Sequence, residues 1–142
     1  MNKEDLIMNK NLDKNLVTGN ELIDSQHSEL IGKIYKLIDC CGEGGGKVET
    51  IKMLDYLSDY TEFHFGEEEK LQEEAAYPGL AEHRKKHEEF RQAVAELHEM
   101  LIEEEGPTDA FVNAVQKNVK DWMFEHIQNV DKAVAAYIQA KA

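Results

Sequence analysis

The chain has 142 residues, of which 42% are hydrophobic and 32% charged. This length suits one domain with a proper hydrophobic core. The formal net charge of −13 excludes nucleic acid as a partner, because no basic stripe exists to neutralise phosphates. No segment is apolar enough for a signal peptide or a membrane span, so we expect a cytoplasmic protein with no membrane contact.

The first predicted helix spans about residues 19–41 and follows a polar N-terminal arm at about residues 1–17. Thr18 and Glu21 have the Thr-x-x-Glu spacing of a capping box, which indicates a helix start. The glycine-rich residues 42–46 end the helix. Between these signals, the residues of one buried face recur at three- and four-residue steps: Ile23, His27, Leu30, Ile31, Ile34, Leu37 and Ile38.

Three further helices are predicted at about residues 47–75, 78–105 and 109–140. Pro78 suits the first position of a helix. Each helix has a buried stripe at helical spacing. The stripes are Leu54, Leu57, Thr61, His64, Glu68 and Leu71; Leu80, His83, His87, Phe90, Val94, Leu97 and Leu101; and Phe111, Val115, Val119, Trp122, His126, Val130, Ala133 and Val134. Four amphipathic helices with short connections predict a single all-α domain over residues 1–142, an up-down-up-down antiparallel four-helix bundle with an N-terminal arm.

Five of the six histidines lie on these stripes, namely His27, His64, His83, His87 and His126. The pairs His64/Glu68 and His83/His87 are spaced i,i+4, which places each pair on one helix face. A buried carboxylate such as Glu68 is rare unless it is paired or bound to metal. At about 1.5 Å of rise per residue, these groups and Asp131 share one level of an antiparallel bundle.

Asp131 follows His126 by five residues, which is roughly 140° around an α-helix. We therefore expect Asp131 to flank the stripe and bridge two ions, rather than to stack on His126 and bind the same ion. The sixth histidine, His98, lies off the stripes and is expected to face solvent. Cys40 and Cys41 are adjacent, a position that rarely allows a disulfide, so we expect free thiols.

Five imidazoles and two carboxylates exceed what one tetrahedral zinc ion uses. Two octahedral ions offer about twelve positions. The imidazoles, two bridging carboxylates and one shared oxo or hydroxo bridge fill all but one of these, which leaves room for a small diatomic ligand. The odd number of histidines predicts three on one ion and two on the other.

The motif set of the chain resembles that of the hemerythrin family, in particular its bacterial members, over about residues 17–131. The motifs are Asp24-Ser25-Gln26-His27, His64-Phe65-x-x-Glu68-Glu69, Tyr77-Pro78, His83-x-x-x-His87 and His126-Ile127-x-x-x-Asp131. The resemblance implies a non-haem di-iron centre, with an oxo or hydroxo bridge, that binds O2 reversibly and is not an enzyme.

The resemblance also implies a division of the ligands between the two irons. His83, His87 and His126 would hold one iron and His27 and His64 the other, while Glu68 and Asp131 would bridge them.

Four residues depart from the family pattern. Leu12 stands where many bacterial relatives have tryptophan, and Glu67 and Gln72 occupy positions that are often apolar. Asn129 also replaces an apolar residue. Pointing inward, it would polarise the oxygen pocket and speed autoxidation; pointing outward, it would have no such effect.

Three alternatives stay open at this stage. A di-iron enzyme acting on peroxide or nitric oxide is disfavoured, because the Glu-x-x-His motif of ferritin-like oxidases does not occur in the sequence. A sensor of O2 or iron level would act through a partner protein. A purely structural bundle would bury Glu68 without metal, at a cost of several kcal/mol. Imidazole and carboxylate ligands also suit zinc, copper, nickel or manganese.

Overall fold

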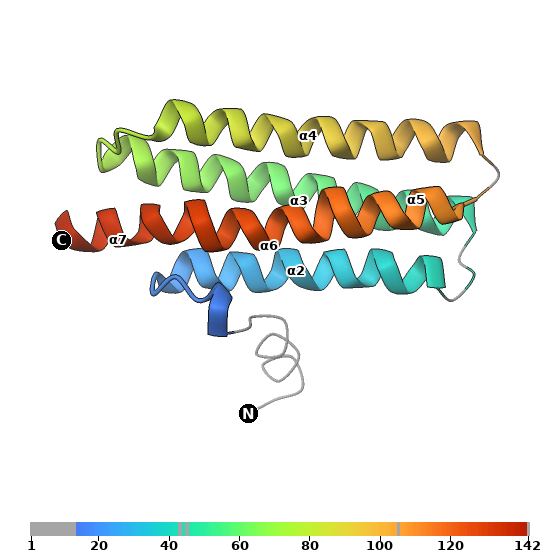
Figure 1. Ribbon diagram of the computed structural model, residues 1–142, viewed down its shortest axis with the longest axis horizontal. Helices are drawn as coiled ribbons and strands as arrows, with labels where there is room; N and C mark the ends of the chain where they lie inside the picture. Colours follow the sequence, from blue (N-terminus) through green and yellow to red (C-terminus); the bar gives the residue numbers. More distant parts are fainter. Residues whose placement is uncertain (1–13, 43, 45, 105, 142) are drawn as a thin grey trace.

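The computed structural model describes residues 14–42, 44, 46–104 and 106–141. The first thirteen residues of the predicted arm, including Leu12, lie outside the described residues. Within the described ranges all regular secondary structure is helical, as predicted (Figure 1). A short 3-10 turn, η1 (Lys14–Leu16), precedes the long helices and buries Leu16 against the core.

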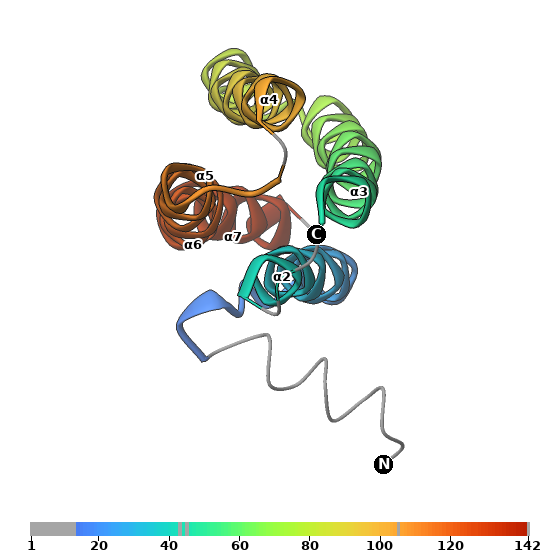
Figure 2. The same cartoon turned by 90° about the vertical axis from the view of Figure 1, so that its right-hand side faces the viewer.

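The described residues form four long helical rods. Three are single helices: α2 (Glu21–Gly42), α3 (Lys47–Glu74) and α4 (Leu80–Glu103). The fourth rod comprises α5 (Asp109–Ala114), η2 (Val115–Asp121), α6 (Trp122–His126), η3 (Ile127–Asp131) and α7 (Lys132–Lys141). In Figure 1, α2 and α4 run in one direction, and α3 and the fourth rod run in the other. The end-on view shows the four rods around a common centre (Figure 2).

The fourth rod is not the regular α-helix predicted for residues 109–140, because η2 and η3 are π-helical. A π-helix pairs residue i with i+5 and is rare outside functional sites. The buried row of this rod repeats every four residues: Phe111, Val115, Val119, Met123, Ile127, Asp131 and Ala135. On an ordinary α-helix such a row would drift by about 40° per step. The wider π turns keep it facing the core.

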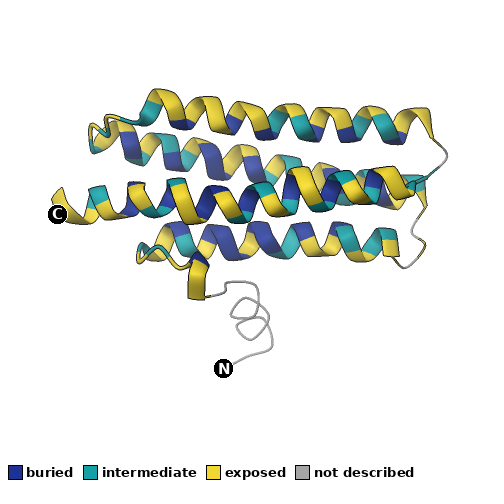
Figure 3. Ribbon diagram, in the orientation of Figure 1, coloured by how far each residue is buried: buried dark blue, intermediate teal, exposed yellow. Residues whose placement is uncertain are grey.

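This change of period corrects the predicted stripe of the fourth helix. Trp122 and Val130 are only half-buried and Ala133 is exposed, whereas Met123, Ile127 and Ala135 are buried. In the other three rods most of the predicted stripe is buried. Figure 3 shows buried residues along all four rods, with exposed residues between them. None of the described helices combines the length and the apolar character that a membrane crossing requires.

Two helix starts also differ from the prediction. Asn20, not Thr18, caps α2, since its side-chain oxygen accepts a hydrogen bond from the Ile23 backbone N–H at 3.0 Å. Thr18 instead donates its hydroxyl hydrogen to Asp24 at 2.7 Å. The helix expected to open at Pro78 begins at Leu80.

Candidate metal centre

The structure brings the seven predicted ligand residues together inside the bundle, and none is more than 4% exposed. They come from all four rods: His27 on α2, His64 and Glu68 on α3, His83 and His87 on α4, His126 on α6 and Asp131 on η3. They form two groups, and within each group one ligand atom per residue lies within 4.8 Å of the others. One group is His83, His87 and His126; the other is His27, His64, Glu68 and Asp131.

The two carboxylates lie between these groups. Asp131 Oδ1 is 3.0 Å from His83 Nε2 and 3.3 Å from His126 Nε2, while its Oδ2 is 2.9 Å from His27 Nε2. Each oxygen of Asp131 therefore faces a different group. Glu68 Oε1 is 2.6 Å from His64 Nε2 and 4.0 Å from both His27 Nε2 and His87 Nε2. Glu68 thus approaches histidines of both groups through a single oxygen, Oε1.

The π turn η3 explains the position of Asp131. We expected five residues to place Asp131 about 140° from His126, on the assumption of an α-helix. In a π turn the i and i+5 residues come one above the other, and the Asp131 carboxylate reaches His126. The expectation that the two side chains do not stack is wrong, although the expected place of Asp131 between two groups agrees with the geometry.

Three residues that the sequence did not single out as functional hold the outer ring nitrogens of the histidines. His64 Nδ1–H donates to Gln26 Oε1 at 2.7 Å, and His87 Nδ1–H donates to Glu69 Oε2 at 2.8 Å. The Gln72 amide lies 2.6 Å from His83 Nδ1. The contacts of Gln26 and Glu69 fix the ring orientation and the tautomer of His64 and His87, so that Nε2 of each ring carries the free lone pair.

Only one of these contacts had a partial signal in the sequence. Gln72 is fully buried on the inner face of α3, one helical turn beyond Glu68, at a position that departs from the family pattern. The predicted stripe ended at Leu71, so the burial of Gln72, and with it the need for a hydrogen-bond partner, was not predicted.

Burial keeps most of the imidazoles neutral. It is the main cause that lowers the pKa of His64 to about 4, that of His87 to about 2, and that of His126. Burial acts in the same direction on His83, but the contacts with Asp131 and Glu68 outweigh it and raise the His83 pKa. Neutral imidazoles are the form that binds metal.

The two carboxylates differ in charge. Burial, and then repulsion from Asp131, raises the pKa of Glu68. Burial also acts to raise the pKa of Asp131, but His126, His27 and His83 together lower it. Asp131 is thus the carboxylate that keeps its charge among the imidazoles.

The donor set fits metal ions. Many buried polar atoms of the site have no hydrogen-bond partner among the described residues. They are both nitrogens of His27, Nε2 of His64 and His87, Nδ1 of His126, and both oxygens of Glu68 and Asp131. Leaving such atoms unpaired in the interior is costly. Bound cations would satisfy the atoms that face one another across the two groups.

Aromatic rings pack on two of the ligand side chains. Phe65 stacks on His87 with ring centroids 3.7 Å apart and planes 5° apart. Trp122 stacks on His126 at 4.5 Å and 14°. These contacts limit rotation of the imidazoles and surround them with apolar surface.

Asn129 takes the outward of the two orientations considered. It is exposed and lines a surface hollow of about 330 Å³ next to Trp122 and His126. It therefore does not polarise the interior of the site. Both cysteines are free thiols, as expected.

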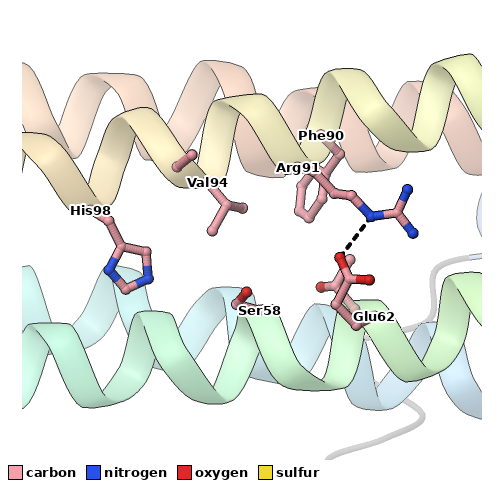
Figure 4. A pocket seen from close by; sticks show the side chains of 8 residues that line it. Ser58, Glu62, Phe90, Arg91, Val94 and His98 are labelled. Carbon is pink, nitrogen blue, oxygen red and sulfur yellow. Dashed lines mark hydrogen bonds and ion pairs between the residues drawn. The ribbon is translucent and has the colours of Figure 1, made fainter.

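His98 lies outside the site. It does not face solvent fully, although we had expected that it would. Its side chain is 31% exposed and forms an ion pair of 3.1 Å with Asp55 on α3. It lines a hollow of about 230 Å³ between α3 and α4, where Arg91 pairs with Glu62 at 2.7 Å (Figure 4). None of the seven candidate ligands lines this hollow.

Comparisons with known proteins show the family of the chain. Residues 18–138 match the family described as Hemerythrin HHE cation binding domain. The chain is 32% identical over 122 residues to a bacteriohemerythrin of Stenotrophomonas maltophilia, covering 86% of this chain and 76% of that protein. It is 33% identical over 125 residues to one of Pseudomonas aeruginosa (88% and 76%). It is 29% identical over 117 residues to one of Methylococcus capsulatus (82% and 86%).

Proposed function

The chain belongs to the hemerythrin family, and on that premise we propose that it binds O2 reversibly at a pair of iron ions, as a carrier, storage or delivery protein and not an enzyme. One observation carries the proposal: the oxygens of Asp131 face two separate groups of buried imidazoles. A carboxylate placed in this way suits a bridge between two ions.

The two groups divide the ligands between the ions. His83, His87 and His126 would hold one iron, and His27 and His64 the other, with Glu68 and Asp131 shared. When bound, the iron pair, with an oxo or hydroxo bridge, would supply the two electrons that reversible binding of O2 requires. The seven side chains named here would hold it.

The surrounding residues orient the ligands and exclude water. Gln26 and Glu69 hold the outer nitrogens of His64 and His87, so that both rings present Nε2 to the interior. Gln72 has an amide oxygen without a partner among the described residues, and a 180° rotation of the amide presents this oxygen to His83 Nδ1–H. Histidine-rich ligation and stacked aromatic rings favour holding O2 over activating it further.

The wider setting is proposed from the sequence. Residues 1–142 would form one domain of a cytoplasmic protein whose ligand is O2. The charge of −13 supports the proposal that it binds no nucleic acid. A protein partner is not indicated by the motifs of the site.

The test is anaerobic loading with iron(II), followed by metal counting and optical spectra through repeated cycles of air and vacuum. We expect about two irons per chain, from the ligand count, and a colour change that reverses. A single iron per chain, or colour that bleaches irreversibly in the first cycle, would contradict the proposal. Sustained consumption of added peroxide would favour the alternative of a di-iron enzyme.

A further inference from the structure

The ring of Phe65 on α3 contacts both a candidate ligand and a cation near the surface. It is fully buried and stacks on His87, with ring centroids 3.7 Å apart. The guanidinium carbon of Arg91 lies 5.5 Å from the centre of the same ring, which is a cation–π distance. His87 and Arg91 are spaced i,i+4 on α4, so both side chains lie on one helix face. Arg91 is therefore connected to the candidate metal centre through a single aromatic ring.

Two carboxylates hold the Arg91 guanidinium at this place. Its Nε–H donates to Glu62 Oε1 at 2.7 Å, the pair drawn in Figure 4, and its Nη1–H donates to Glu88 Oε2 at 3.4 Å. Both carboxylate side chains are more than half exposed. Exposed ion pairs of this kind contribute little to the stability of a fold. Their consequence here is the orientation of a planar cation that stacks well on an aromatic ring.

The ring contact supplies a restraint that the hydrogen bond of His87 does not. Glu69 accepts the bond from His87 Nδ1–H at 2.8 Å, and one hydrogen bond leaves the imidazole free to tilt about that bond. The parallel Phe65 ring, whose plane is 5° from that of His87, prevents the tilt. Metal sites need their ligands within about 10–20° of the productive direction. The direction of His87 Nε2 therefore depends on the Phe65 ring staying in place.

We propose that Arg91 is a positioning residue of the candidate metal centre. Its guanidinium holds the Phe65 ring parallel to His87, and the ring in turn holds Nε2 of His87 toward the other candidate ligands. The proposal rests on the proposed function in that His87 must bind metal. The restraint on the His87 ring is independent of metal, because the chain itself makes every contact named above.

Lys33 on α2 provides a matched control. Its ammonium lies 5.6 Å from the centre of the Tyr60 ring, and it pairs with the exposed Glu29 at 3.4 Å. Lys33 thus has the same two kinds of contact as Arg91, namely a cation–π contact with an aromatic residue of α3 and an exposed ion pair. Among the described residues, no ring contact joins Tyr60 to a candidate ligand. Lys33→Met therefore removes the same kind of contact without affecting the centre.

The first test follows the His87 Nδ1–H proton of the metal-free full chain by nuclear magnetic resonance with isotope-labelled histidine. We expect Arg91→Met to speed exchange of this proton with water by about two- to fivefold, the change that corresponds to one cation–π contact. Arg91→Lys keeps the positive charge and should restore part of the protection. Lys33→Met should leave the exchange rate unchanged, and circular dichroism checks that each variant is folded. An unchanged rate in Arg91→Met overturns the proposal.

The second test is a double-mutant cycle on the affinity for iron(II), measured anaerobically by competition with a chelator. Arg91→Met should weaken affinity by about two- to fivefold, and Phe65→Leu should weaken it at least as much. In the Phe65→Leu background, Arg91→Met should add nothing, because the ring through which it acts is gone. An effect of Arg91→Met that persists in that background overturns the proposal. A chain that binds no iron contradicts the proposed function, and the proton-exchange result then decides the role of Arg91 by itself.

Discussion

At the scale of single residues, Glu69 sets the character of one candidate ligand. Its carboxylate accepts the His87 Nδ1–H bond at 2.8 Å and also binds Arg84 at 3.1 Å. A carboxylate partner makes the ring a stronger metal ligand. We therefore expect Glu69→Gln to weaken metal affinity by about 10- to 100-fold, measured by competition with a chelator.

Glu73→Gln is the control for Glu69→Gln, because Glu73 also binds Arg84, at 3.1 Å, and has no contact with a ligand histidine among the described residues. It should leave affinity unchanged. An equal loss in both variants would show that Arg84, and not the His87 contact, is responsible.

A second prediction at this scale separates the candidate ligands from the remaining histidine. His83→Ala or Glu68→Ala should abolish binding of two ions per chain, since each removes a group between or within the two clusters. His98→Ala should leave metal loading intact, because His98 pairs with Asp55 and belongs to neither of the two groups of candidate ligands. Metal counting on the three variants decides this, and similar losses in all three would contradict the assignment.

The sequence predicted the seven candidate ligands but not the residues that orient them. His64 and Glu68 are recognisable as candidate ligands from the sequence. An imidazole and a carboxylate at i,i+4 share one helix face, and burying them without a metal ion or another partner is costly. Gln26 has no such signal, because it directly precedes His27 and lies off the predicted stripe. Only the packing of α2 against α3 brings it to His64.

At the scale of helices, three of four rods follow the spacing expected of an α-helix, and the fourth does not. The departure of the fourth rod corresponds to the four-residue repeat of buried residues that runs from Phe111 through Ile127 to Ala135. In a helix with about 3.6 residues per turn, this row would be divided between two faces. The predicted stripe therefore placed Val130 and Ala133 inside the core in place of Ile127 and Asp131.

The π turn η3 gives a prediction for the order of two residues. The double substitution Val130→Asp and Asp131→Val exchanges the two residues without changing chain length. It places the carboxylate four residues after His126, which is the spacing that an α-helix would favour. Because Val130 is half-buried at the rim of the surface hollow, a carboxylate there points away from His27 and His83. We expect at most one ion per chain, by metal counting, with helix content unchanged.

The control exchange, Gln128→Asn with Asn129→Gln, lies in the same π turn and involves only exposed residues. It should keep both ions. If the Val130/Asp131 exchange also bound two ions, the π turn would not be needed to place the carboxylate.

At the scale of the whole molecule, the site makes the stability of the metal-free protein depend on pH with two opposite slopes. Below pH 6.5 the histidines with lowered pKa values, His64, His87 and His126, stay neutral when folded and take protons when unfolded. The unfolded chain gains protons at these three histidines, and this number exceeds the single proton that the folded protein keeps on Glu68, whose pKa is raised. Stability therefore falls with acidification, by about 1.4 kcal/mol per pH unit for each extra proton.

Above pH 6.5 the slope reverses, because the raised pKa of His83 lets the folded protein hold a proton that the unfolded chain releases. The raised pKa of Glu68 acts in the same direction above the ordinary pKa of a glutamate. We expect maximum stability of the metal-free protein near pH 6.5, measured by chemical denaturation across pH. A stability that rises steadily from pH 5 to pH 9 would contradict the charge states assigned to these two groups.

Metal binding should remove the alkaline side of this profile. Ligands bind metal in their deprotonated forms, so loading requires a neutral His83 and an ionised Glu68. We expect loading to release protons from His83 and Glu68, measured by calorimetry in buffers of different ionisation enthalpy. The loaded protein then has no extra protons to lose, and its stability should stay level between pH 7 and pH 9. His98→Ala should release the same number, whereas loading without proton release would mean that Glu68 and His83 are already in their ligand forms.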